Sequence, residues 1–208
     1  VEKHPERGTP YTPIAMLLDP AHGWDMTDYP HWPFGISQIE RSDHALRELF
    51  GAAYYPAPVT EGEAATADRQ AYVASVFGDI FDVLIASETR KDAIDAYRAL
   101  IVGGRVEWSP AWSKRLEDYV RKGGVLVINA AQAKGLSDEL LGVRITGEKA
   151  EADEASCLSP DETKADLRGQ MFRYERVEAR KGVQVLIETP THEPLVTINK
   201  LGRGKLVF

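Results

Sequence analysis

Residues 95–132 read DAYRALIVGGRVEWSPAWSKRLEDYVRKGGVLVINAAQ and decide the fold of this chain. Two short runs within them, 99–102 and 125–128, are apolar at every position, which is typical of strands that helices cover on both faces of a parallel sheet. Ser109 before Pro110 predicts the N-cap and the first turn of a helix between these strands. A lysine followed by two glycines, at 122–124, predicts the end of that helix. A strand, a helix and a strand in this order predict a parallel pair joined by a right-handed crossover.

The same pattern recurs toward the N-terminus. Apolar runs at 14–18 and 81–86 predict two more buried strands, and amphipathic segments at 36–50 and 71–77 predict helices. Strands that alternate with helices in this way predict an α/β fold with a doubly wound, mostly parallel sheet.

The last third of the sequence is different. Residues 143–145 and 171–177 alternate between apolar and polar, and shorter apolar runs follow around a turn-rich connection. We expect a β-rich C-terminal extension of the same sheet, within a single domain that spans 1–208. Residues 146–168 are acidic, rich in alanine and weakly patterned, so we expect a mobile surface insertion there.

The composition excludes several classes of protein. Hydrophobic residues make up 43% of the 208 residues and charged residues 27%, close to the average of globular proteins. No uninterrupted apolar stretch approaches the roughly 18–20 residues that span a bilayer, so we expect no membrane partner. The net charge is −7 without a stripe of Lys and Arg, so we expect no nucleic-acid partner.

Cysteine usage and the two chain ends do not fix the cellular compartment of the protein. The single cysteine, Cys157, rules out an internal disulfide and a thiolate metal site. The chain opens at Val1 without methionine and stops at Phe208 within an apolar run, so we expect a piece excised from a longer protein. A leader sequence could have been lost with the rest, which leaves the compartment open, an extracytoplasmic one included.

Three stretches carry a resemblance to a known fold. Residues 95–132, together with YTPIAMLLD at 11–19 and EPLVTINKLGRGKLVF at 193–208, resemble the class I glutamine amidotransferase-like fold. They are most similar to the trimerisation domain of certain bacterial β-galactosidases, a glycoside hydrolase-associated domain. The resemblance implies a flavodoxin-like, amidotransferase-like α/β domain that is non-catalytic and takes part in an oligomer. Its motifs are structural, so they say more about the fold than about the function.

The amidotransferase chemistry can be tested on the sequence itself. By the resemblance, a cysteine nucleophile would stand on the sharp turn after strand 125–128, beside backbone N–H groups that hold an oxyanion. This chain reads Asn129-Ala130-Ala131-Gln132 at that turn, and Cys157 lies in the acidic segment instead. Glutaminase activity is therefore not expected.

Polar and aromatic side chains follow the predicted strands, where ligands bind in open parallel sheets. Indole rings stack on the C–H faces of sugars while carboxylates and amides bind the hydroxyls, so this set predicts a carbohydrate-binding cleft. We expect its ligand-binding residues to be Trp24, Asp25, His31, Trp32, Arg105, Trp108, Asn129 and Gln132. The alternative is that the tryptophans of the 20–34 loop pin that loop onto the domain, or meet a neighbouring domain or subunit.

Two glutamates at strand ends, Glu88 and Glu107, are candidates for the acid and base of a glycosidase. The alternative reading makes both of them solvated charges on the rim of the sheet. The 20–34 loop also holds histidines and aspartates, but their spacing fits no strong zinc or calcium pattern. We therefore expect neither a metal nor a cofactor.

Two functions from different classes lead, ahead of a third, a purely structural interaction domain. The first is a non-catalytic module of a carbohydrate-active multidomain protein, which supports oligomer contacts or borders a neighbouring sugar site. The second is a stand-alone sugar-binding or glycoside-hydrolysing protein that uses the carboxylates at the strand ends. The missing nucleophile and the abrupt chain ends favour the first. Its partners would be a carbohydrate and either a neighbouring domain or further copies of the same chain.

Overall fold

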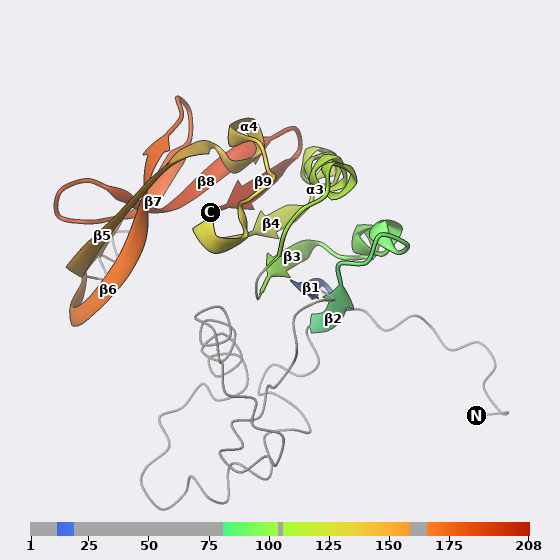
Figure 1. Ribbon diagram of the computed structural model, residues 1–208, viewed down its shortest axis with the longest axis horizontal. Coiled ribbons are helices and arrows are strands. Elements are labelled where there is room, and N and C mark those ends of the chain that lie inside the picture. The colour runs from blue at the N-terminus through green and yellow to red at the C-terminus, as the bar shows by residue number, and fades with distance from the viewer. Residues whose placement is uncertain (1–11, 19–80, 104–105, 159–165) are drawn as a thin grey trace, which may run out of the picture.

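The computed structural model describes residues 12–18, 81–103, 106–158 and 166–208 (Figure 1). The helices expected at 36–50 and 71–77 lie outside these residues, so the double winding of the sheet stays a prediction. None of the helices in the described part of the chain is long and apolar enough to cross a membrane.

In the part of the chain that the structure describes, five parallel strands form one half of a nine-stranded mixed sheet. Every residue of β1 from Ala15 to Leu18 is buried, as its unbroken apolar run predicts, because the strand lies between two others. The strands predicted in this half are all present, within one residue of their expected ends. Their spatial order is β2 (Phe81–Ile85), β1 (Ile14–Leu18), β3 (Ala99–Val102), β4 (Val125–Val127) and β9 (Gly204–Val207).

The helix predicted to start at Ser109 is α3 (Pro110–Lys122). Ser109 is its N-cap, and the hydroxyl accepts a hydrogen bond from the backbone N–H of Trp112 at 3.2 Å. Gly123 ends the helix with a φ of 123°, a conformation that glycine adopts at little cost. The buried face of α3 packs toward β4 and β9 and consists of Trp112, Leu116, Tyr119 and Val120.

Two glycines near the C-terminus let the last hairpin approach the end of α3. Gly202 has a φ of 61°, and a Cβ there would lie 2.6 Å from the carbonyl oxygen of Arg121. A Cβ on Gly204 would overlap the carbonyl oxygen of Val120. Arg203, between them, donates its backbone N–H to the Arg121 carbonyl at 3.0 Å. The Gly-x-Gly motif of the tail therefore serves close packing of the helix against the hairpin.

Among the described residues, three short helices were not predicted. They are η1 (Lys91–Ala96) after β2, η2 (Ala130–Gln132) after β4 and α4 (Asp138–Leu141) ahead of the antiparallel half. Each is too short for a helical period of apolar residues to show in the sequence.

The other half of the sheet is antiparallel and continues from β9. This arrangement confirms the predicted β-rich C-terminal extension of the same sheet, which Figure 1 shows beside the parallel half. Its strands follow β9 in the order β8 (Pro194–Leu201), β7 (Gln184–Glu188), β5 (Val143–Cys157) and β6 (Asp166–Ala179).

The β5–β6 hairpin contains most of the segment 146–168 that was expected to be a mobile insertion. The secondary structure differs from that expectation, because the residues up to Cys157 form a strand. Cross-strand ion pairs support the pairing, and hydrophobic periodicity does not reveal them. Arg168 lies 2.9 Å from Glu154, for example, between a guanidinium nitrogen and a carboxylate oxygen. Whether the hairpin is an insertion stays a prediction.

Candidate functional site

The carboxyl ends of β2, β3 and β4 point to the same edge of the sheet, because the three strands run parallel. The described segments that follow them are 86–90, 106–109 and 128–132. The candidate residues Glu88, Glu107, Trp108, Asn129 and Gln132 all belong to these segments. Trp24, Asp25, His31, Trp32 and Arg105 lie outside the described residues, and their roles stay predictions.

Glu88 connects the end of β2 to the start of α3. Its carboxylate accepts a hydrogen bond from the hydroxyl of Ser109 at 2.6 Å, and it also pairs with the ammonium of Lys91. The Lys91 hydrogen bond, followed by the one from Ser109, holds the pKa of Glu88 below its usual value. A lowered pKa suits a base or a nucleophile and does not suit a proton donor.

Glu107 forms an ion pair with Lys134. Its carboxylate lies 2.6 Å from the ammonium of Lys134, and both side chains are mostly exposed. The two candidate glutamates therefore belong to different ion pairs, one made with Lys91 and one with Lys134.

Trp108 points into the protein. Its side chain is 7% exposed, and the indole N–H donates a hydrogen bond to the carbonyl oxygen of Gln132 at 2.7 Å. The ring centre lies 5.9 Å from that of Trp112 in a tilted arrangement. In this geometry the indole joins the segment after β3 to the turn after β4.

The turn after β4 is closed by its own side chains. The amide oxygen of Asn129 accepts a hydrogen bond from the backbone N–H of Ala131 at 2.8 Å. The amide oxygen of Gln132 accepts one from the backbone N–H of Asn129 at 3.2 Å, which completes a reciprocal capping box. Gln132 is only 2% exposed. Both amides expected to bind a ligand therefore serve the turn itself through their oxygens.

The sequence did not reveal the partners that position these residues. Ser109 was identified as a helix cap, but its second role as a donor to Glu88 depends on the spatial meeting of β2 and α3. Lys91 and Lys134 come from short segments without any motif. No signal in a single sequence could have singled them out.

A hollow of about 250 Å³ lies between β2, η1 and the first turn of α3. Leu17, Ile85, Ser87, Arg90 and Trp112 are among the residues that line it. The indole N–H of Trp112 is buried and has no acceptor among the residues that the structure describes.

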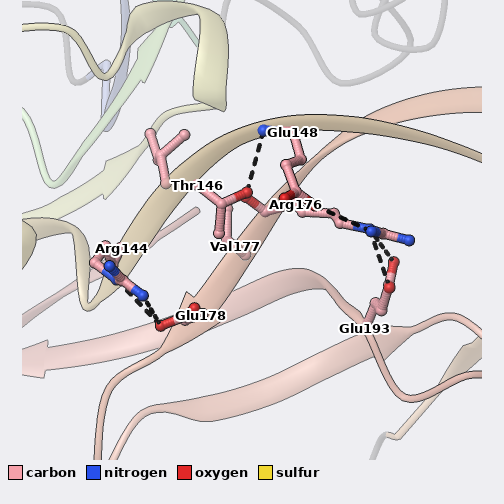
Figure 2. A pocket seen from close by; sticks show the side chains of 8 residues that line it. Arg144, Thr146, Glu148, Arg176, Val177, Glu178 and Glu193 are labelled. Carbon is pink, nitrogen blue, oxygen red and sulfur yellow. Dashed lines mark hydrogen bonds and ion pairs between the residues drawn. The ribbon is translucent and has the colours of Figure 1, made fainter.

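A larger hollow of about 470 Å³ lies at the base of the β5–β6 hairpin (Figure 2). The register of β5 shifts between Ile145 and Lys149, and Gly147 within the shift has a φ of 81°. A β-bulge bends the strand that carries it, and Ile145, Thr146 and Glu148 of the bulged stretch line the hollow.

Ion pairs fill the polar side of this larger hollow, as Figure 2 shows. Arg176 bridges Glu148 on β5 and Glu193 in the β7–β8 turn, with nitrogen-to-oxygen distances of 3.1 Å to each. Tyr174 also donates its hydroxyl to Glu193, and burial followed by this hydrogen bond raises the pKa of Tyr174. Each arginine of the hollow therefore has a carboxylate partner. The contacts of Arg176 and Tyr174 with Glu193 connect the hairpin to the β7–β8 turn.

Metal ligands do not gather in the described part of the chain, where no group of three or more His, Cys, Asp or Glu could hold an ion. Cys157 lies in β5 opposite Ile187 of β7, well removed from the turn after β4 in the sheet order.

Comparisons with known proteins give information on the fold. The sequence matches no known protein family and no curated protein. Among solved structures, a β-galactosidase from Bacillus circulans sp. alkalophilus is similar with a TM-score of 0.57 at 14% identity, over 95% of this chain and 28% of that one. A putative ThuA-like protein from Bacteroides uniformis ATCC 8492 has a TM-score of 0.51 at 12% identity, over 98% of this chain and 83% of that one. A cytoplasmic protein from Salmonella typhimurium LT2 has a TM-score of 0.52 at 14% identity, over 93% and 86%.

These similarities confirm an α/β fold and extend over nearly the whole chain. This chain spans 28% of the length of the β-galactosidase. At identities of 12–14% the similarities show the fold alone, so the expected resemblance to β-galactosidase domains holds at the level of the fold.

Proposed function

We propose that this chain is a non-catalytic, amidotransferase-like module of a carbohydrate-active multidomain protein. It supports oligomer contacts or borders the sugar site of a neighbouring domain. The fold that it shares with just over a quarter of a β-galactosidase supports this assignment.

The turn after β4 carries the proposal. An amidotransferase needs a nucleophile there and free backbone N–H groups to hold an oxyanion. This chain has no Cys, Ser or Thr in residues 129–132. The backbone N–H groups of Asn129 and Ala131 already donate to the amide oxygens of Gln132 and Asn129. The hydrogen bonds that stabilise the turn therefore occupy two of its backbone N–H groups, which supports a non-catalytic turn.

The electrostatics at the strand ends also favour a non-catalytic role over glycoside hydrolysis by Glu88 and Glu107. A glycosidase needs one carboxyl group whose pKa is raised, so that it can donate a proton to the leaving group. Lys91 and Ser109 lower the pKa of Glu88 instead. Glu107 is exposed and paired with Lys134.

Hydrolysis assays on the 208-residue chain test the absence of catalysis. We expect no turnover of glutamine or of a panel of nitrophenyl glycosides above the rate in buffer. Turnover that Glu88→Gln or Glu107→Gln abolishes at an unchanged melting temperature would refute the proposal. Glu139→Gln is a matched control, because Glu139 is also exposed and ion-paired but lies on α4.

A thermal-shift screen against mono- and oligosaccharides tests the sugar-bordering role. A ligand at about 100 times its dissociation constant adds roughly 2.7 kcal/mol to the native state. Each kcal/mol moves the midpoint of a chain of this size by about 2–4 °C, so binding is readily visible. A selective shift supports a sugar border, and a uniform lack of shift leaves oligomer contacts as the role.

A further inference from the structure

The β6 strand forms one end of the sheet. It pairs with β5 along one edge, and no other described strand pairs with it. With 14 residues it is also long for an edge strand, as Figure 1 shows at the far end of the antiparallel half. An edge of this length presents unpaired N–H and C=O groups that can bind another strand.

The regular part of this edge centres on Tyr174. Residues 172–175 pair with 149–152 of β5 without interruption. The side chains of Arg173, Glu175 and Val177 share one face of β6, because alternate residues of a strand point to the same side. Met171 is 65% exposed, and 62% of the Arg173 side chain is exposed.

We infer that β6 pairs with β6 of a second copy of this chain, antiparallel, around a two-fold axis at Tyr174. Opposite residues of an antiparallel pair have side chains on the same face of the sheet. A two-fold axis perpendicular to the sheet must therefore pass between two copies of the same residue. An axis at Tyr174 places Arg173 of each copy opposite Glu175 of the other. By symmetry, this contact occurs twice.

The neighbouring registers are unfavourable. An axis at Arg173 would place two arginines opposite each other, and an axis at Glu175 would oppose two glutamates. An axis two residues away, at Phe172, would place Arg173 opposite Met171 and lose the pairing of opposite charges. Like charges directly opposite on adjacent strands destabilise the pair, so the charges select the Tyr174 register.

The charges of β5 extend this pattern across the interface. Arg173 forms an ion pair with Glu151 on β5, and Glu175 lies opposite Lys149 in the register of the hairpin. A row across the two copies therefore reads Glu151, Arg173, Glu175 and Lys149, with the sign of the charge alternating at every step. The two-fold axis generates the same row in the opposite direction, so the edge of one copy complements the charges of the other. This charge pattern argues for a second copy rather than an unrelated strand.

This inference specifies the partner for the oligomer contacts proposed above, and it involves none of the residues at the strand ends. Self-association could therefore use a different surface without affecting the assignment of a non-catalytic module.

Charge reversal and mixing test the pairing. Sedimentation velocity of the whole chain over a range of concentrations measures the dimer dissociation constant. We expect a dimer for the wild type and a constant at least about tenfold weaker for Arg173→Glu and for Glu175→Arg, because each reversal creates two like-charge contacts. An equimolar mixture of the two variants should dimerise again. In the mixed dimer, one chain carries two acidic side chains at positions 173 and 175, and they face two basic side chains of the other chain.

Lys114→Glu, an exposed reversal on α3, is the matched control and should leave the dissociation constant unchanged. Recovery in the mixture also shows that each variant is folded. A wild type that stays monomeric would overturn the inference together with the oligomer role. An oligomer that both reversals leave intact, or a mixture that fails to associate, would overturn the β6 contact alone.

Discussion

Replacing Trp108 by phenylalanine is expected to cost more stability than the same replacement at Trp112. Both side chains are buried, with 7% and 3% of their surface exposed, and their rings contact each other. They differ in one respect. The indole N–H of Trp108 donates to the carbonyl oxygen of Gln132 at 2.7 Å, whereas that of Trp112 has no acceptor in the described part of the chain.

The difference between the two variants isolates this hydrogen bond. Each substitution removes the same part of the indole ring, so the cost of the cavity is common to both. Trp108→Phe also removes the buried hydrogen bond to the Gln132 carbonyl, which costs about 1–3 kcal/mol. Trp112→Phe removes a buried donor that has no partner among the described residues, which offsets part of its cavity cost. We expect a gap of about 1–3 kcal/mol in the free energy of unfolding, or roughly 2–12 °C in melting temperature.

Urea unfolding followed by far-UV circular dichroism measures this gap without relying on tryptophan fluorescence. Calorimetry gives the melting temperatures, and equal m-values would show that the denatured states are comparable. Equal losses in the two variants, or a larger loss for Trp112→Phe, would refute the reasoning.

Three further predictions concern packing and ionisation. Gly204→Ala should cost about 1–3 kcal/mol in urea unfolding, because the new methyl group would overlap the Val120 carbonyl. Burial raises the pKa of Tyr119 above its ordinary value of 10.0, so the unfolded chain releases this proton first and stability falls as the pH rises above about 10. Tyr119→Phe should make that alkaline fall shallower in unfolding curves, and an unchanged slope would contradict the assignment. Lys91→Ala should move the pKa of Glu88 up toward 4.5 in a carboxyl NMR titration. No movement would show that Lys91 is not its main partner.

Local signals explain why so much of the parallel half could be predicted. The strand 99–102 and the limits of α3 match their expected bounds, because an apolar run, an N-cap followed by proline and a terminal glycine each act within a few residues. The hairpin at 143–179 could not be predicted as a strand pair in the same way. Its register depends on contacts such as Arg173 with Glu151, which lie far apart in the sequence.

The strand-end site was also predictable only in part from the sequence. The position of Glu88 and Glu107 after parallel strands follows from the order of the elements. Their state does not follow from it, because Lys91 and Lys134 reach them only in the folded chain. The inward orientation of Trp108 likewise depends on the carbonyl that accepts its N–H.

The sequence by itself determined the strands and the helix of the parallel half, the absence of a nucleophile at the turn after β4, and the exclusion of a disulfide scaffold. These conclusions depend on residue identity and short-range periodicity. Only the tertiary structure decided that Asn129 and Gln132 satisfy the donors of that turn, and that β6 ends the sheet with complementary charges along its edge. Such properties arise from contacts between distant segments, where hydrogen-bond geometry and charge depend on which side chains the fold brings together.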